Sequence, residues 1–303
     1  MKNIKKVLVG LELNQVDSYL LDYLRSVAFY LKPEEIKFIN IHQEELPEDI
    51  AKKFPEIVND IDEHFIKEMV EETTNISVLD TNVSYQAITG SVLEEILKAA
   101  NEPDIDLLVI GRKNDKHQRN LHYQKIIRKA VSNILIIPET KSKELKKILV
   151  PIDFSEYSTY SLNKAIDLAL EANAEIIIQN IYEVPTGYSK TGKSFLEFAN
   201  IMEKNATESY MIFLKNIDFK GVKHETIFTL NDSGSTSKTI EGAIEILKPN
   251  LLVLGSKGKN KFSAILVGST AESLIGKRDI KIPILLTRIR SHSVSFWDAL
   301  KEF

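Results

Sequence analysis

Three glycines near the end of the chain, together with two hydroxyl residues, have the spacing of a phosphate-binding loop. Gly255 and Gly258 come directly after an apolar run, and Gly268 is followed by Ser269 and Thr270. Glycine lets backbone N–H groups approach a ligand closely, and the unpaired N–H groups at the start of a helix attract anions. The two hydroxyls add further donors. This pattern predicts a cradle for the phosphates of a nucleotide.

The same glycines can instead serve only as turn residues. Ser269 and Glu272 have the spacing of a capping box, in which Ser269 is a helix N-cap and contacts no ligand. Ser91 and Glu94, in the first half of the chain, have the same spacing and predict a capping box there. We favour nucleotide binding at the glycines because a strand pattern comes before them and a helix pattern follows. The turn interpretation stays the alternative.

A second phosphate-binding pattern lies earlier in the same half of the chain. The segment 187–194 matches G-x4-G-K-[ST], the Walker A pattern, with Gly187, Gly192, Lys193 and Ser194 at the defining positions. It follows the second expected strand of its half rather than the first, and no later strand of that half ends in an aspartate that could hold magnesium. We weigh a phosphate loop or lid that uses Lys193 against a solvated loop, and slightly favour the solvated loop.

The composition is that of an ordinary globular protein. The chain has 303 residues, of which 43% are hydrophobic and 27% charged, and its net charge is −4. That charge gives no reason to expect nucleic acid or an anionic membrane as a partner. There is no cysteine, which rules out disulfides and thiolate zinc sites. No apolar run is long enough for a secretory signal or a membrane span, so we expect a cytoplasmic protein.

The elements that position these motifs repeat with a period close to half the chain length. Each half alternates short apolar runs with amphipathic segments, which predicts parallel strands joined by helices. The expected strands are 6–12, 35–41, 83–88, 107–111 and 134–137 in the first half and 147–153, 175–181, 224–230, 251–254 and 284–287 in the second. The predicted fold class is α/β, with two tandem doubly wound parallel five-stranded sheets.

A polar segment separates the two halves. Residues 139–144 contain no apolar side chain, so we predict a first domain at 1–140 and a second at 145–290. The last segment, 291–303, has the pattern of a short amphipathic helix. We expect this tail to pack on its own domain rather than to bind a partner.

The chain resembles the universal stress protein family over nearly its whole length. The most specific segments are 148–155, 252–258, 268–272 and 282–286. The resemblance implies a Rossmann-like sheet with strand order 3-2-1-4-5 and a ligand at the carboxyl ends of the first and fourth strands. It also implies that the second half binds ATP, or alternatively ADP or AMP, with or without magnesium. The residues implied as the nucleotide site are Pro151, Ile152, Asp153, Ile181, Leu254, Gly255, Lys257, Gly258, Gly268, Ser269 and Thr270. A helix cap or turn residue is the alternative role for Asp153.

The first half departs from this pattern after two of its strands. Glu12 stands where the second half has Asp153. Arg112 follows the glycine at the end of the fourth strand, and no glycine occurs between 112 and 133. We predict that the first half has lost nucleotide binding and is structural or regulatory.

The sequence says little about partners other than the nucleotide. The fifth strand of each half is strongly apolar, and an exposed apolar edge strand invites aggregation. The resemblance implies that the two fifth strands cover each other, so that the halves form a pseudo-dimer within one chain. A further homodimer stays open, and the sequence names no protein partner.

Three functions stay in consideration. We favour an ATP-binding protein of stress response or regulation. The alternatives are an ATPase or phosphotransferase that uses the segment 187–194, and a scaffold that binds no nucleotide. No residues have the order of a catalytic triad or of paired catalytic carboxylates, so we expect at most slow ATP hydrolysis. His117 and His122 lack the spacing of metal ligands, and we expect no metal site.

Overall fold

The computed structural model describes residues 4–43, 53, 55–76, 81–113, 121–141, 144–257 and 267–289. These residues form two compact units, and the boundary along the chain lies between Lys143 and Glu144. The first unit holds the described residues up to 141, and the second unit holds those from 144 to 289. Each unit has a sheet and a core of its own.

The first unit contains a five-stranded parallel sheet with strand order β3-β2-β1-β4-β5. Its strands are β1 (Lys6–Leu11), β2 (Glu35–His42), β3 (Asn82–Thr89), β4 (Leu107–Arg112) and β5 (Asn133–Pro138). Its helical elements are α1 (Gln15–Leu31), α3 (Pro55–Thr73), the 3-10 turn η1 (Thr74–Ile76), α4 (Val92–Ala100) and α5 (Leu121–Lys129). β1 pairs in parallel with both β2 and β4, so the direction of the winding reverses at β1.

The second unit repeats this plan, with strand order β8-β7-β6-β9-β10. Its strands are β6 (Lys147–Ile152), β7 (Glu175–Tyr182), β8 (His224–Leu230), β9 (Leu251–Gly255) and β10 (Ile284–Thr287). Its helical elements are α6 (Glu156–Ala172), the 3-10 turn η2 (Thr186–Thr191), α7 (Phe195–Leu214), α8 (Thr236–Leu247) and α9 (Ser269–Gly276). β6 pairs with both β7 and β9, as β1 does with its two neighbours.

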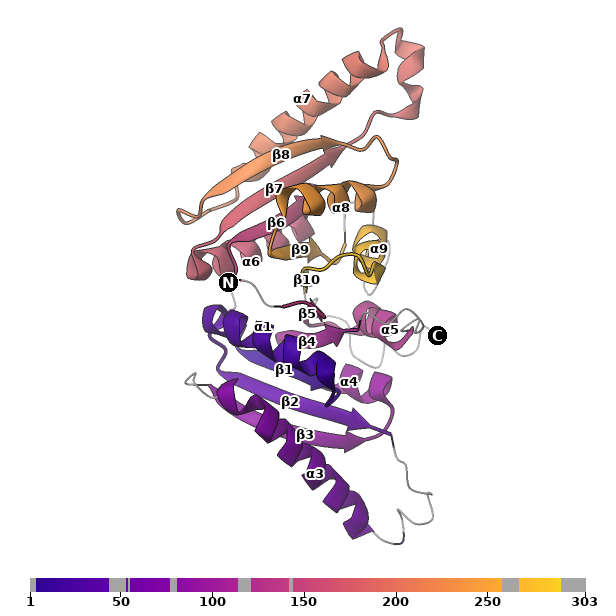
Figure 1. The fold of residues 1–303 in the computed structure, drawn as a ribbon. Helices are drawn as coiled ribbons and strands as arrows, with labels where there is room; N and C mark the ends of the chain where they lie inside the picture. The colour runs from indigo at the N-terminus through magenta and orange to yellow at the C-terminus, as the bar shows by residue number, and fades with distance from the viewer. Residues whose placement is uncertain are drawn as a thin grey trace. The chain divides into compact units, whose positions relative to one another are not determined.

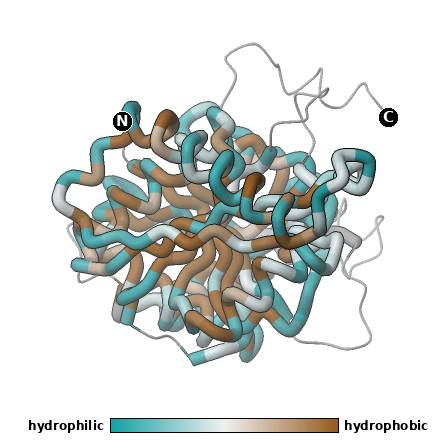
Figure 2. The backbone as a smooth tube through the Cα atoms, turned by 90° about the horizontal axis from the view of Figure 1, so that it is seen from above, coloured by the Kyte–Doolittle hydropathy of each residue, from teal (hydrophilic) through white to brown (hydrophobic). Residues whose placement is uncertain are grey.

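Helices cover both faces of each sheet (Figure 1). Right-handed crossovers place helices on opposite faces before and after the winding reverses. In the first unit α1 and α3 therefore share one face, and α4 and α5, which contact each other, share the other. In the second unit α6 and α7 correspond to the first pair, and α8 and α9 to the second. The strands between these layers are strongly apolar (Figure 2).

Burial on both faces explains why the strands read as continuous apolar runs rather than as alternating ones. The first four residues of β4 are all buried, and so are the first four of β9. The predicted fold class and the strand order 3-2-1-4-5 are confirmed in both units. The predicted pairing of the two fifth strands stays a prediction.

Helix starts differ from the expectations in detail. Ser91 is the N-cap of α4, but its side chain makes no capping hydrogen bond, so the predicted capping box with Glu94 is wrong. A capping box that we did not predict joins Asn14 and Asp17 at the start of α1. There the Asn14 side chain accepts backbone N–H groups of the first turn, which is the bond that Ser91 does not make in α4.

Some predictions concern residues outside the described parts of the chain. They are the tail 291–303, Gly258 and His117, and the side chain of His122 is also outside them. Among the described helices, none combines the length and the apolar composition that crossing a bilayer requires. No group of three or more histidine and carboxylate side chains within the described ranges is placed to hold a metal ion.

Candidate functional site

The carboxyl ends of β6 and β9 lie where the winding of the second unit reverses. The two strands are paired at two positions only, the second of which joins Leu149 and Leu252. β6 nevertheless runs on through Pro151 to Ile152, and β9 runs on to Gly255. In doubly wound sheets, ligands bind where neighbouring strands part and their loops lead to opposite faces. The loops after β6 and β9 therefore frame the candidate site.

Asp153 follows β6 directly and is held by the start of α6. Its Oδ1 accepts hydrogen bonds from the Ser158 hydroxyl at 2.7 Å and from the Ser155 N–H at 3.1 Å. Its own N–H donates to Ser158 Oγ at 2.9 Å. Phe154 has a φ of 63°, a left-handed conformation that turns the chain sharply into the helix. Asp153 thus has the turn role that we gave as its alternative, and these contacts also fix its carboxylate at the edge of the sheet.

β7 fixes the end of β6 from the other side. Asn180 is buried, and its side-chain amide donates to the carbonyl of Ile152 at 3.0 Å. Asn40 makes the same bond to Leu11 in the first unit, also at 3.0 Å. Ile181 follows Asn180 and is half-buried. Sequence analysis missed both asparagines, although a polar residue at matching places in two apolar strands was a visible signal.

The loop after β9 returns to the end of that strand at Gly268. The Gly268 N–H donates to the carbonyl of Ser256 at 2.6 Å, and the Ser256 N–H donates to the carbonyl of Thr287 at 3.0 Å. Thr287 Oγ1 in turn donates to the carbonyl of Leu254 at 3.1 Å. The two glycine-containing segments, which are far apart along the chain, therefore lie within hydrogen-bonding distance of each other.

The start of α9 has no N-cap side-chain hydrogen bond. Gly268 is the N-cap, so Ser269 and Thr270 occupy the first turn. The first N–H groups of a helix have no partner within it, and α9 places them beside the end of β9. The predicted capping box of Ser269 with Glu272 is wrong, because Gly268 and not Ser269 is the N-cap of α9. The interpretation of Ser269 as only an N-cap therefore loses its basis.

The structure shows a packing reason for the glycine at 255, beside the predicted approach of a ligand. A Cβ at this position would lie 3.1 Å from Ser161 Oγ and 3.3 Å from the Cβ of Tyr157, both on α6. Such distances are shorter than ordinary van der Waals contact. The missing side chain lets α6 pack closely on the end of β9.

Two cations lie next to the bonded pair Ser256 and Thr287. Lys257 is half-buried, and burial together with the positive charge of Arg288 lowers the pKa of its ammonium group. Arg288 is 8% exposed, and burial lowers its pKa to about 10. Two partly desolvated positive charges close to each other favour an anion nearby. Sequence analysis included Lys257 but missed Arg288, because a single arginine after a strand carries no pattern.

The Walker-like segment does not have the structure of a P-loop. Thr186–Thr191 form the 3-10 turn η2, and Ser194 is the N-cap of α7. Glu197 Oε2 accepts hydrogen bonds from the N–H and the hydroxyl of Ser194, both at 2.8 Å. The Glu197 carboxylate therefore bonds to the Ser194 N–H and hydroxyl, which in a P-loop would bind phosphate and magnesium. Within the described chain, no hydrogen bond or ion pair joins the segment to β6, β9 or α9. Its exposed residues include Gly187, Gly192 and Lys193.

In the first unit, charged side chains of the protein itself occupy the loops after β1 and β4. Lys113, after β4, forms an ion pair with Glu12, after β1. The N–H groups of Glu12, Leu13 and Asn14 donate to Asp17 Oδ2 at 2.9, 2.6 and 3.4 Å. Three N–H groups that converge on one point are suited to binding an anion, and here the anion is internal. An external anion would have to compete with it.

Comparison with known protein families identifies the domain that carries the site. Residues 144–288 match the model of the universal stress protein family. The second unit is therefore a universal stress protein domain. The matched region runs from just before β6 to just after β10 and so covers the second unit. The family resemblance that the sequence predicted is confirmed.

Relatives and solved structures agree with this assignment. Universal stress protein MJ0577 of Methanocaldococcus jannaschii is 27% identical over an alignment of 168 positions, which covers 47% of this chain and 94% of the relative. Universal stress protein MJ0531 of the same organism is 28% identical, over 47% of this chain and 82% of its own length. The crystal structure of a universal stress protein from Archaeoglobus fulgidus aligns with a TM-score of 0.67 over 95% of this chain and 99% of its own, at 17% identity. That alignment extends the family fold over both units.

Proposed function

We propose that the second unit binds ATP, with ADP and AMP as alternative ligands, and that the protein acts in regulation or stress response rather than in catalysis. The observation that carries this proposal is the hydrogen bond from the Gly268 N–H to the Ser256 carbonyl. It holds the start of α9 at the carboxyl end of β9. Unpaired helix N–H groups at the edge of a doubly wound sheet are a recurring site for phosphate. The match of residues 144–288 to the universal stress protein family supports nucleotide binding in general.

In the proposed site, different residues contact the phosphates and the nucleoside. The α9 start and the Lys257 ammonium supply donors and positive charge for the phosphates. The Asp153 carboxylate is an acceptor suited to the ribose hydroxyls. The residues proposed as walls around the base are Pro151, Ile152, Ile181 and Leu254. The remaining proposed phosphate contacts are Gly255, Gly258, Gly268, Ser269 and Thr270.

We propose further that the first unit binds no nucleotide. The ion pair of Glu12 and Lys113 joins the loops after β1 and β4, where a ligand would need to enter. The Asp17 carboxylate takes three backbone N–H groups of the same loop. Both features place negative charge where phosphates would lie, and like charges repel.

The Walker-like segment gives little support to an ATPase or phosphotransferase. In a P-loop the serine hydroxyl coordinates magnesium, but the Ser194 hydroxyl donates to the Glu197 carboxylate. Lys193 is exposed and has no contact with the end of β9 within the described residues. We therefore propose that the segment is a bystander to nucleotide binding.

The proposal is tested by calorimetric titration of the full chain with ATP, ADP and AMP, with and without magnesium. Lys257→Met removes a proposed phosphate contact and should weaken ATP binding about tenfold or more. Lys193→Met makes the same chemical change in the Walker-like segment and should leave affinity within about twofold. The proposal fails if no nucleotide binds. It also fails if Lys193→Met weakens binding and Lys257→Met does not, because the segment 187–194 would then be the phosphate site.

A further inference from the structure

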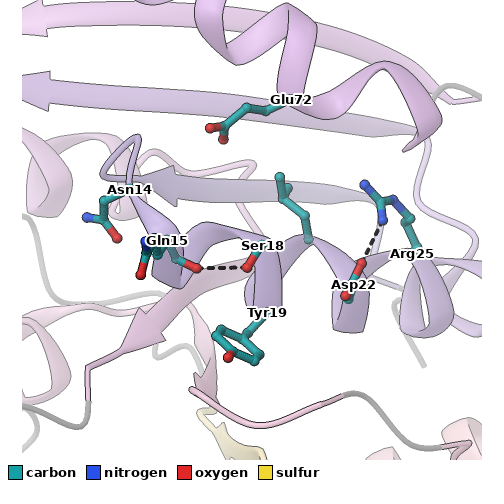
Figure 3. A pocket seen from close by; sticks show the side chains of 8 residues that line it. Asn14, Gln15, Ser18, Tyr19, Asp22, Arg25 and Glu72 are labelled. Carbon is teal, nitrogen blue, oxygen red and sulfur yellow. Dashed lines mark hydrogen bonds and ion pairs between the residues drawn. The ribbon is translucent and has the colours of Figure 1, made fainter.

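The first unit has a cavity of about 530 Å³ between α1 and α3, and its lining begins at Asn14 and Gln15, at the start of α1. Its wall on α1 is one helix face, made by Ser18, Leu21, Asp22 and Arg25 at spacings of three and four residues. Glu72, in the last turn of α3, closes the other side and points toward α1 (Figure 3). The volume is in the range of sites that hold small organic ligands.

The charge of Glu72 is not matched by the protein. Its Oε2 is buried and has no hydrogen-bond partner, and no described cation forms an ion pair with Glu72. Burial, together with the negative charge of Glu68, raises the pKa of the Glu72 carboxyl. The only cation on the α1 wall, Arg25, is already paired with Asp22 at 2.7 Å. Glu72 as a whole is half-buried, but a buried carboxylate oxygen without a partner costs free energy, so a structural role alone does not explain Glu72.

The second unit shows that the fold does not require this charge. Arg25 is the eleventh residue of α1, and the eleventh residue of α6 is Ile166, which is 1% exposed. Phe213 stands in the last turn of α7, as Glu72 does in α3, and its ring lies 5.6 Å from that of Phe154. The corresponding positions therefore hold apolar side chains in the second unit and charged ones in the first.

We propose that the cavity between α1 and α3 binds a small organic ammonium compound, whose charged group pairs with Glu72. The available groups match such a ligand, because an ammonium group has three donors and no acceptor. Ser18 Oγ donates to the Gln15 carbonyl at 2.8 Å and keeps its lone pairs for a ligand donor. Leu21 offers an apolar surface to a short carbon chain. A metal ion is a poor match, since the described residues hold no group of three metal-ligand side chains.

The site is tested with the full chain in the absence of nucleotide, because amines also bind ATP directly. The probes are putrescine, agmatine and glucosamine, and the uncharged counterparts are butanediol and glucose. Binding is followed by calorimetry and by chemical-shift changes at α1 and the end of α3. At least one amine should bind, and its uncharged counterpart should not.

Two matched variants separate a local contact from general attraction to an acidic protein. Glu72→Gln keeps the shape of the side chain and should weaken amine binding about tenfold or more. Glu68→Gln removes the same charge from a half-buried residue one turn earlier on the same helix and should change affinity much less than Glu72→Gln does. Glu72→Phe copies the second unit and should abolish binding while the melting temperature is kept or raised. The proposal is overturned if no amine binds, if uncharged counterparts bind equally well, or if Glu68→Gln and Glu72→Gln have equal effects.

Discussion

Asp17 and Ser158 occupy the same position in the matching loops of the two units. Each stands three residues after the N-cap of the helix that follows the first strand. Each accepts the N–H of the residue after that strand at 2.9 Å, from Glu12 in the first unit and from Asp153 in the second. Only Asp17 carries a charge. The exchange of a hydroxyl for a carboxylate therefore makes the first loop sensitive to pH.

We expect Asp17 to make the first unit less stable as pH rises. Burial raises the pKa of Asp17 from 3.8 to about 6, against the lowering effect of three backbone N–H groups. The folded state then holds the proton more tightly than the unfolded state, so stability is highest below the unfolded pKa and falls as pH rises to about 6. The loss should be about 2 to 3 kcal/mol in the free energy of unfolding. Urea unfolding at about pH 4 and about pH 7 measures it.

Asp17→Asn removes this titration and should flatten the pH dependence. Asp22→Asn changes a carboxylate on the exposed side of the same helix and serves as the control. If the two variants show the same pH dependence as each other, Asp17 does not have the predicted role.

Gly255 and Gly242 should respond to alanine in opposite ways. A Cβ at Gly255 would meet α6 at 3.1 Å, whereas a Cβ at Gly242, within α8, meets nothing within 4 Å. Gly255→Ala should therefore destabilise the protein by about 1 to 3 kcal/mol. Gly242→Ala should stabilise it by about 0.5 to 1 kcal/mol, since glycine is a poor helix former. Thermal unfolding of the two variants compares these effects, and equal shifts would contradict the packing role of Gly255.

The fold was predictable because apolar runs and helix spacing are local signals. The strand order came from the family resemblance, since no local pattern tells which strands are neighbours. The proximity of Ser256 and Gly268 followed from the glycine spacing, but the reason for Gly255 did not, because a glycine that serves packing looks the same in sequence as one that serves a ligand. Arg288 and Glu72 were missed for a similar reason: their surroundings come from segments distant in the chain.

Part of the structure of the Walker-like segment could have been predicted from the sequence. Glu197 stands three residues after Ser194, which is the spacing of a capping box. Two motifs thus overlapped at one serine, and the local one prevails in the structure. Local hydrogen bonds within one helix turn need no ligand to form, whereas a P-loop needs a strand and a helix placed correctly around it.

Ser194→Ala should destabilise the start of α7. The Ser194 hydroxyl accepts the Glu197 N–H at 3.3 Å and donates to the Glu197 carboxylate, and losing a cap of this kind costs about 1 kcal/mol. Ser91→Ala is the matched control, because Ser91 occupies the N-cap of α4 without a side-chain capping bond. Amide hydrogen exchange in the first turns of α7 and α4 measures both. A larger effect at Ser91 than at Ser194 would contradict this account of the two helix starts.

Nucleotide affinity should fall with rising pH, and the fall should begin at a lower pH than the titration of a lysine with an ordinary pKa would cause. Burial and the charge of Arg288 lower the pKa of Lys257 from its usual 10.5. The protonated form attracts phosphate, so the attraction is present at neutral pH and is lost as pH rises through the lowered pKa. Titration with ATP at several pH values between neutrality and 10.5 measures the loss. Lys257→Arg keeps the charge over this range and should bind ATP with a much flatter pH dependence. A loss of affinity that is equal in the two proteins would place the titrating group elsewhere and would remove Lys257 from the proposed phosphate contacts.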